Sequence, residues 1–374
     1  MKFDGALATP PISLIGRKVE IVAADGFRPT LVFDPRNVGD GGWGERMFLL
    51  NASELTLRGV AIDFTVPTQD VVASKWSVFE ATGPTSLTLI DSTATVCNAP
   101  GEAFSAPLHS NVAFFRSTFE AASLDELATD AATVERGVTS VRLDGVFARG
   151  EAALCATNGV GVSLEARRCA FNVSGPIFGA NEGERTSGAE RSTLHFDRVV
   201  VAGRSALANR VERDGATGSL FPLDATLTNS AIWLGGAPLA SAQSSRDAEI
   251  SAADAAIAWN LDGSLLLDAE PVLRARSRQT SATRDWPLTF DAPPNASAKL
   301  DDLNLEAVAR LSQTPPHQFA LVDFGRWILT PAQTSSALDS ATRETVGEIK
   351  AIVVDGTPPS SNDERNDAAT AETD

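Results

Sequence analysis

Three acidic residues occupy the same place in a short sequence phrase that recurs along the chain. The phrase reads apolar, polar, apolar, acidic, and it fills residues 141–144, 162–165 and 194–197. If the three phrases are stacked β-strands, Asp144, Glu165 and Asp197 form one column with a spacing of about 4.8 Å. Carboxylate oxygens that converge on one point are ligands that Ca²⁺ takes in proteins. This column is therefore a candidate calcium site.

A second column lies beside it in the same register and contains Arg142, Ser163 and His195. A pair of carboxylates next to an arginine can carry out general acid and base chemistry on a sugar chain. The alternative interpretation is structural, because outward positions on any sheet are polar and Arg142 and His195 can neutralise acids on neighbouring strands. Both interpretations stay open, and the structural one is the more common.

The elements that would position these columns are short strands. Alternation of apolar and polar residues over four to six positions is typical of a strand with one buried face. Related phrases begin at residues 55, 87, 112, 141, 162, 194 and 225, at intervals of 32, 25, 29, 21, 32 and 31 residues. A recurring unit of this length indicates a solenoid or another repeat array.

Short strands with Gly, Asn or Asp at the corners favour one fold class. We expect an all-β chain folded as a single-stranded right-handed parallel β-helix with a small mixed C-terminal segment. An up-and-down sandwich is the alternative, but it needs hairpins, and Asn158-Gly159 is the only strong hairpin turn in the sequence. The expected divisions are the β-helix at residues 1–275, C-terminal coils or a cap at 276–354, and a disordered acidic tail at 355–374.

Two segments depart from the strand pattern. Residues 121–136 contain the capping box Ser-Leu-Asp-Glu and are predicted to form a short helix on a corner. Residues 301–311 are predicted to form a second helix with acidic residues at its start, and residues 319–329 to form last strands or part of a cap.

Composition argues against several classes of function. The chain has 31 Lys and Arg against 48 Asp and Glu, a net charge of −17, whereas nucleic-acid binding needs clustered basic residues. No apolar run approaches the length of a membrane-spanning helix, and the first residues contain no apolar signal core. A cytoplasmic location is expected if the chain is complete as written. Three histidines and three scattered cysteines give no zinc-binding spacing.

Two stretches resemble known β-helix proteins. Residues 16–29, Gly-Arg-Lys-Val-Glu-Ile-Val-Ala-Ala-Asp-Gly-Phe-Arg-Pro, resemble the opening coil of β-helix regions in large planctomycete proteins, many of which carry a serine/threonine kinase domain. Residues 164–171 resemble coils of the pectate-lyase-like superfamily. The resemblance implies a fold and no catalytic residues, because the sequence lacks kinase motifs and the aspartate, histidine and arginine motifs of pectin hydrolases and lyases.

Two functions follow as expectations. The first, which leans away from an enzyme, is a non-catalytic module that presents a long sheet face to a protein or carbohydrate, within a larger signalling protein. The second is a polysaccharide lyase or glycoside hydrolase with calcium as its candidate cofactor, acting through Asp144, Glu165, Asp197, Arg142 and His195. The enzyme needs a groove in which these side chains converge, whereas the binding module needs only a shallow face.

Overall fold

The computed structural model describes residues 1–34, 45–66, 75–98, 111–118, 139–158, 161–182, 191–212, 223–244, 257–267, 269–277, 280–292 and 296–298. Within these ranges every helix or strand assigned is a β-strand, which confirms the expectation of an all-β chain. The helices predicted at 121–136 and 301–311, the strands or cap at 319–329 and the acidic tail at 355–374 lie outside the described residues.

The strands form two sheets. The 17-stranded sheet contains β1 (Gly5–Ala8), β3 (Lys18–Val22), β4 (Pro29–Phe33), β6 (Glu54–Arg58), β7 (Ala61–Val66), β9 (Ser86–Ile90), β10 (Thr93–Asn98), β12 (Thr139–Asp144), β13 (Phe147–Gly150), β15 (Val162–Val173), β17 (Ser192–Gly203), β19 (Leu223–Thr228), β20 (Ala231–Trp233), β22 (Ile257–Asn260), β23 (Leu265–Leu267), β26 (Phe290–Ala292) and β27 (Ala296–Ala298). The ten-stranded sheet contains β2 (Ile12–Ile15), β5 (Arg46–Asn51), β8 (Trp76–Ala81), β11 (Val112–Thr118), β14 (Ala153–Asn158), β16 (Phe178–Glu182), β18 (Ala208–Glu212), β21 (Pro238–Ser244), β24 (Glu270–Ser277) and β25 (Thr283–Pro287).

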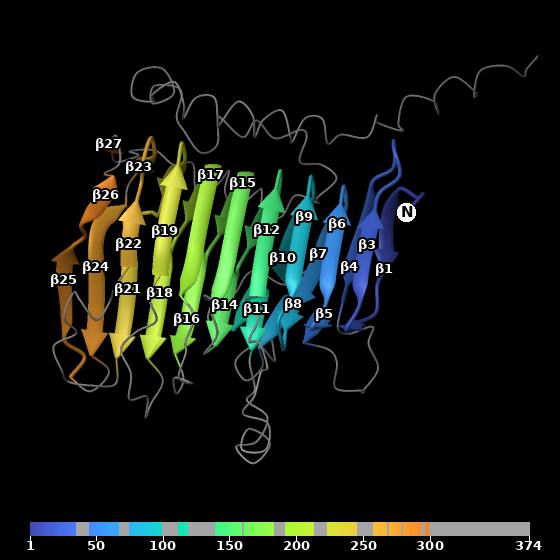
Figure 1. The fold of residues 1–374 in the computed structure, drawn as a ribbon, viewed down its shortest axis with the longest axis horizontal. Helices are drawn as coiled ribbons and strands as arrows, with labels where there is room; N and C mark the ends of the chain where they lie inside the picture. The colour runs from blue at the N-terminus through green and yellow to red at the C-terminus, as the bar shows by residue number, and fades with distance from the viewer. Residues whose placement is uncertain are drawn as a thin grey trace, which may run out of the picture.

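Neighbouring strands run parallel throughout the 17-stranded sheet and in all but one pair of the ten-stranded sheet. In the 17-stranded sheet β12 pairs with β15 and β15 with β17, and in the ten-stranded sheet β14 pairs with β16 and β16 with β18. The repeats stack from β1 at one end to β25 at the other (Figure 1). Among the described strands, only β24 and β25 pair antiparallel. The expectation of parallel strands is confirmed, and the up-and-down sandwich is wrong, since β14 and β15 on either side of Asn158-Gly159 lie in different sheets.

Two of the predicted phrase starts are wrong. One row of equivalent residues runs along the 17-stranded sheet: Val19, Leu55, Leu87, Val141, Leu164, Leu194, Ala225 and Trp259. In β15 the equivalent residue is therefore Leu164, because Val162 pairs with Thr139. Residue 112 begins β11, which belongs to the other sheet.

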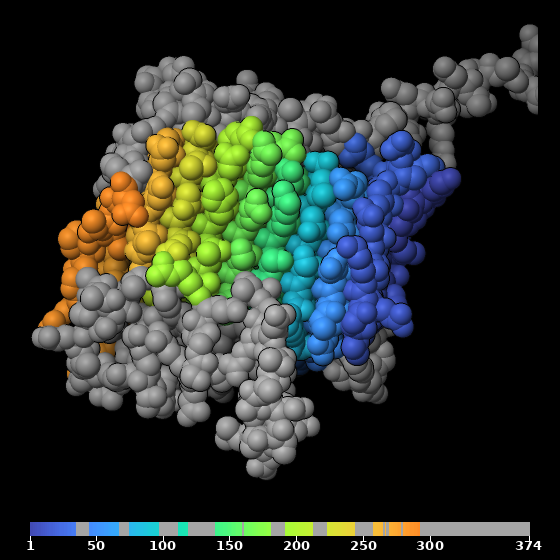
Figure 2. Space-filling view, in the orientation of Figure 1, coloured from blue at the N-terminus to red at the C-terminus, as the bar shows by residue number. Residues whose placement is uncertain are grey.

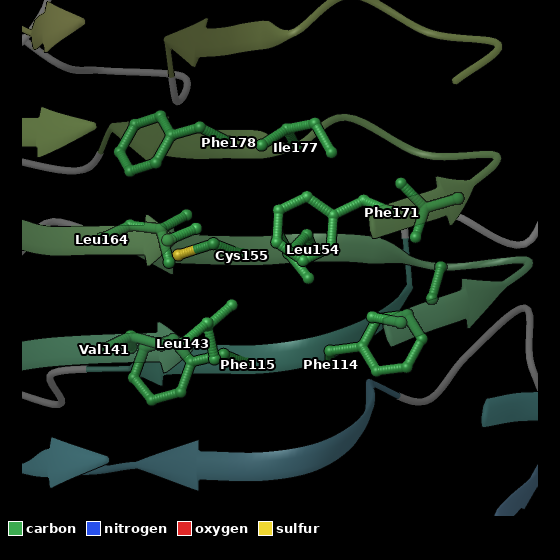
Figure 3. Close-up of a cluster of buried hydrophobic side chains, with 14 of the residues drawn as sticks. Phe114, Phe115, Val141, Leu143, Leu154, Cys155, Leu164, Phe171, Ile177 and Phe178 are labelled. Carbon is green, nitrogen blue, oxygen red and sulfur yellow. The ribbon is translucent and has the colours of Figure 1, made fainter. Parts of the chain in front are cut away.

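The core consists of inward side chains stacked in rows. In the ten-stranded sheet one such row contains Phe48, Phe79, Phe115, Cys155 and Phe178, each at most 2% exposed. The rings of Phe48 and Phe79 stack with centroids 5.1 Å apart. Figure 3 shows Phe115, Cys155 and Phe178 beside Val141, Leu143 and Leu164 of the other sheet. In the central repeats these rows keep one face of each strand out of water, and polar side chains can occupy the opposite face.

Each repeat turns at the same place in the 17-stranded sheet, either between two strands or, in β15 and β17, within one continuous strand. The residue at this corner has a positive φ in seven successive repeats: Gly59, Asp91, Gly145, Arg168, Arg198, Asn229 and Gly263. The left-handed conformation is easy for glycine and tolerated by Asp and Asn. It costs an arginine roughly 1 kcal/mol or more, which makes Arg168 (φ 51°) and Arg198 (φ 55°) positions where another interaction must compensate.

A hydrogen-bond ladder follows the corners. The residue after the left-handed position is often a buried Ser or Cys whose side chain accepts from the backbone N–H of the preceding repeat. Ser92 Oγ accepts from Val60 at 3.3 Å, and Ser230 Oγ accepts from Val199 at 3.1 Å. Cys169 Sγ accepts in the same way from Val146 at 3.4 Å. Each such contact provides an acceptor for a buried backbone N–H group at the corner, where the regular bonding between strands is interrupted.

The two ends of the stack differ. At the N-terminal end, β1 is exposed along its whole length, and Leu7 and Ile15 are 43% and 65% exposed. At the C-terminal end, β25 folds back on β24, and Trp286, Leu288 and Phe290 pack against the core cluster. Figure 2 shows the N-terminal residues at one end of the molecule and residues near 290 at the other.

Candidate functional site: the outward face of the 17-stranded sheet

The predicted acidic column does not form. In the observed register Arg142 pairs with Glu165 and Glu165 with His195, while Asp144 pairs with Arg167 and Arg167 with Asp197. Glu165 therefore lies in the row of Arg142 and His195, and Arg167 stands between the two aspartates. The prediction of a single Asp144, Glu165 and Asp197 column is wrong, and so is the neighbouring column of Arg142, Ser163 and His195, because Ser163 pairs with Ser140 and Thr193.

The error is a slip of two residues in β15. A slip of one residue would move every side chain to the opposite face, and the apolar pattern forbids it. A slip of two leaves each side chain on its own face, so alternation alone cannot detect it. The alternating phrase in β15 begins at Val162, two residues before the position equivalent to Val141. The faces were therefore predicted correctly and the neighbours within the face were not.

The two aspartates are each bound by arginine. Arg168 donates to Asp144 Oδ1 from Nε at 3.0 Å and from Nη2 at 2.7 Å. Asp197 Oδ2 accepts from Arg198 Nη2 at 3.0 Å and lies 3.5 Å from Arg167 Nε. These contacts explain the unusual corner residues, since Arg168 and Arg198 use the left-handed position to reach carboxylates. The negative charge that would attract Ca²⁺ is largely neutralised by these side chains.

The row that contains Arg142, Glu165 and His195, which we call the middle row, is more exposed than the two aspartates. Arg142 Nε lies 4.0 Å from Glu165 Oε2, with the two side chains 63% and 49% exposed. His195 is exposed on the next strand and pairs with Glu165 in the register. At this exposure the ion pair contributes at most about 1 kcal/mol to stability. The row is thus a set of accessible donors and acceptors held on rigid strands.

A third row, which contains Ser140, Ser163, Thr193 and Asp224, completes a polar face. Thr193 Oγ1 donates to Ser163 Oγ at 2.9 Å, and Arg191 Nη1 lies 2.5 and 2.7 Å from the two oxygens of Asp224. The outward residues of β12 and β19, and of β15 and β17 before the corner (residues 162–167 and 192–197), are all polar: Ser140, Arg142, Asp144, Ser163, Glu165, Arg167, Thr193, His195, Asp197, Asp224, Thr226 and Thr228. We call these twelve residues the polar face.

Sequence reasoning identified Arg142 but missed four other arginines and one aspartate of this region: Arg167, Arg168, Arg191, Arg198 and Asp224. Arg167 was detectable, because it continues the alternation of β15 beyond Glu165. Arg168 and Arg198 were not detectable by alternation, because they occupy corner positions outside the strand period. Their signal was instead their equivalence to Gly145 and Asn229 in neighbouring repeats, which requires the correct register.

Metal and ligand sites have little support in the described part of the chain. Among these residues no group of three or more His, Cys, Asp or Glu is placed to hold a metal ion. One cavity of about 20 Å³ lies in the core, lined by apolar side chains that include Phe79, Leu87 and Leu164. It is the size of about one water molecule and offers that molecule no polar partner. The cavity is therefore a packing defect.

Two buried cysteines are poor nucleophiles. Burial raises the pKa of both the Cys155 and the Cys169 thiol to about 12. The reactive species is the thiolate, which is scarce at neutral pH for such groups. Cys169 instead donates a hydrogen bond to the carbonyl of Arg167 at 3.1 Å, as part of the corner ladder. The interpretation of Cys169 as a small buried residue is confirmed.

A second charged cluster lies on the outward side of the ten-stranded sheet. Arg46 Nη1 lies 3.0 Å from Glu80 Oε2, and Thr118 donates to Glu80 Oε1 at 3.1 Å. Arg116 follows in the same row and is 4% exposed; burial lowers its pKa, and Glu80 opposes that shift. Its residues are far apart in sequence, so no local pattern predicts the cluster. The cluster pairs a nearly buried Arg116 with Glu80, and its other side chains are less exposed than those of Arg142 and Glu165.

The polar face is thus the surface on which accessible functional groups gather.

The part of the chain that the structure describes contains no helix long and apolar enough to cross a membrane. No protein-family model, no curated protein and no solved structure matches this chain.

Proposed function

We propose that this chain is a single-stranded right-handed parallel β-helix that acts as a non-catalytic binding module and presents its polar face to a glycan. The fold is supported by parallel pairing between successive repeats and by inward rows that run through both sheets. A relationship to the pectate-lyase-like superfamily and to β-helix regions of planctomycete signalling proteins belongs to the same proposal. It rests on the resemblance of residues 16–29 and 164–171.

The observation that carries the proposal is the polar face itself. Its twelve outward residues offer hydroxyl, carboxylate, guanidinium and imidazole groups on strands spaced about 4.8 Å apart. Protein interfaces usually contain an apolar or aromatic centre, which these residues lack. A sugar chain needs hydrogen-bond partners along an extended path, and the polar face provides them. Of the two expected ligand classes, a glycan therefore fits better than a protein.

The polysaccharide-cleaving enzyme is the less favoured function. General acid and base catalysis needs a carboxylic acid and a carboxylate that face the substrate with free lone pairs. Asp144 and Asp197 are instead engaged by Arg168, Arg198 and Arg167. Glu165 is the most accessible of the three acids, and its neighbours in the row are Arg142 and His195, so no acid lies next to it. This geometry suits positioning of charge better than proton transfer.

A glycan array tests the proposal. The wild-type chain is compared with a variant that clears the middle row, Arg142→Ala/Glu165→Ala/His195→Ala. The matched control removes a hydrogen-bonded pair from the other sheet, Asn209→Ala/Ser241→Ala, whose side chains lie 2.8 Å apart. Each protein is assayed with Ca²⁺ and with a chelator, because calcium is the candidate cofactor. We expect the wild type and the control to bind the same glycans and the middle-row variant to lose that binding.

The outcomes separate the alternatives. Cleavage of a bound polysaccharide, seen as new reducing ends or unsaturated products, would replace the binding module with an enzyme. Binding that survives in the middle-row variant would move the site elsewhere. No binding to any glycan would overturn the choice of ligand. Binding that disappears only with the chelator would restore a role for calcium.

A further inference from the structure

The N-terminal end of the stack has three strand edges that face away from the rest of the molecule. Among the described strands β1 pairs only with β4, β2 only with β5 and β3 only with β6. The three strands are exposed or half-buried along their whole length. An unpaired strand edge is a template for pairing with another chain. We call β1, β2 and β3 together the open end.

The backbone groups at this edge can be assigned by alternation. The carbonyl of Arg17 accepts from the Glu54 amide at 2.8 Å, and the Ala23 amide donates to the Arg58 carbonyl at 2.9 Å. Alternate residues of a strand bond to the same neighbour, so Val19 and Ile21 also face β6. The N–H and C=O groups of Lys18 and Glu20 therefore point to the open side.

The other two strands follow the same rule. The amides of Gly5 and Thr9 donate to carbonyls of Arg28 and Val32, so Ala6 and Ala8 face the open side of β1. The Gly16 amide donates to the Asn51 carbonyl, so Ser13 and Ile15 face the open side of β2. Six residues thus present backbone donors and acceptors, and all six are exposed. Beyond Glu20 the open side of β3 is occupied by Met1, whose amine donates to the Val22 carbonyl and whose carbonyl accepts from the Ala24 amide.

We propose that the open end binds the open end of a second copy of this chain in a two-fold symmetric dimer. A two-fold axis across the end face reverses the direction of every strand. The β3 strand of one copy then pairs antiparallel with the β3 strand of the other. The β1 strand of each copy meets the β2 strand of its partner. All three edges are paired in this arrangement, and the contact closes on itself without forming fibres.

Charge complementarity fixes the register of the central pair. With the axis at Val19, Lys18 of each copy lies opposite Glu20 of the other. Both residues direct their N–H and C=O groups to the partner, so they form the hydrogen-bonded type of antiparallel pair. Their side chains lie on the same outward face of β3, and opposite charges directly across strands are stabilising. A register centred at Glu20 would place like charges together.

The same register covers apolar surface. Val19 faces the core and would meet its symmetry equivalent in the closely spaced, non-hydrogen-bonded type of pair. The half-buried or exposed inward residues of the open end, Leu7, Ile12, Leu14 and Ile21, would lose contact with water. At the C-terminal end β26 and β27 also pair with only one described strand each, but the ten-stranded sheet ends there in β25, which runs antiparallel to β24. A head-to-tail contact would therefore continue the parallel pairing at two of the three edges only. An end-to-end contact between the two open ends is thus favoured over a head-to-tail contact.

Sedimentation equilibrium over a range of concentrations tests the dimer. We expect reversible dimerisation of the wild type. Glu20→Pro removes an amide that faces the partner and leaves the hydrogen bonds to β6 in place, as proline on an edge strand allows; it should weaken dimerisation by tenfold or more. Glu20→Ala keeps the amide and should have a smaller effect. A wild type that stays monomeric at its highest soluble concentration, or a dimer that Glu20→Pro leaves intact, would overturn the proposal.

Charge variants test the register and protect against a folding artefact. Lys18→Glu and Glu20→Lys each place like charges across the dimer and should each weaken self-association. A mixture of the two variants restores an opposite-charge pair at both positions, so native mass spectrometry should show the mixed dimer in excess over either homodimer. A statistical mixture would rule out the Val19-centred register. Neither variant alters the polar face, so a failure here is distinguishable from a failure of glycan binding.

Discussion

The first repeat and the central repeats share a pattern of alternating residues but differ in what surrounds them. In the central repeats every strand has a neighbour on both sides, and inward residues such as Phe79 and Phe115 are at most 2% exposed. In the first repeat each strand has one neighbour, and Ile12 and Leu14, which occupy inward rows, are only half-buried. Alternation specifies which face of a strand turns inward. The number of neighbouring repeats decides how much that face contributes to stability.

Thiol reactivity should show the largest difference between these regions. Burial raises the pKa of Cys155 in the central repeats from 9.0 to about 12. Ile15→Cys introduces an exposed thiol in the first repeat, which should keep an ordinary pKa. At about pH 8 we expect iodoacetamide to label the new thiol roughly a thousandfold faster than Cys155. Peptide mass spectrometry measures both rates in the Glu20→Pro background, which leaves the first repeat uncovered. Similar rates would mean that the central repeats open easily.

Truncation of equivalent inward residues should show the next largest difference. Phe79→Ala removes a fully buried ring stacked on Phe48 and should lower the free energy of unfolding by about 3–5 kcal/mol. Ile12→Ala, in the same row, should cost about 1 kcal/mol because the side chain is already half-exposed. Urea unfolding measures both values. Equal costs would show that the first repeat is as well buried as the centre.

Loss of a hydrogen bond from the corner ladder should also cost more stability in the later repeats than in the first repeat. The difference should be smaller than for the inward side chains. Ser230→Ala leaves the buried amide of Val199 without its acceptor and should cost about 1–3 kcal/mol. Ser53→Ala frees the amide of Arg17, which lies in the exposed first repeat and can bond to water, so the cost should be at most about 1 kcal/mol. Thermal unfolding of the two variants provides the comparison, and the reverse order would contradict it.

Loss of an outward ion pair should show the smallest difference in stability between the central repeats and the first repeat. Asp144→Asn weakens a partly shielded pair with Arg168 and should cost about 1 kcal/mol or less. Glu54→Gln breaks the pair with Lys18 in the first repeat, where the side chains are 56% and 82% exposed, and should cause no measurable change. Unfolding at low and high salt measures both, and salt should reduce the Asp144 effect. A larger loss from Glu54→Gln would contradict this ranking of exposure.

The sequence contained enough information for the strand class and the inward faces. Residues such as Leu55, Leu87 and Leu194 alternate with polar neighbours, and burial of apolar side chains enforces that alternation. Parallel pairing was also predictable, since a single phrase recurs with few hairpin turns between its copies. These features depend on local patterns that survive in any register.

The arrangement of the candidate site was not predictable to the same degree. The neighbours of Glu165 depend on a register that alternation specifies only to within two residues. The pairing of Asp144 with Arg168 depends on a corner whose residue changes from Gly145 to Arg168 between adjacent repeats. Both are contacts between repeats, and nothing in the phrase of a single repeat encodes them.

The stacked corners also bear on how such a chain can change its length. Each corner repeats the left-handed residue of the one before, and the buried Ser and Cys donors and acceptors link adjacent corners only. Val141 now pairs with Leu164, and excision of residues 164–193 would bring Leu194 to the same place. Stability in such an array is a sum of local units and their interfaces. Duplication or loss of a whole unit is therefore a small evolutionary step, which adds or removes length while the remaining strands keep their pairing.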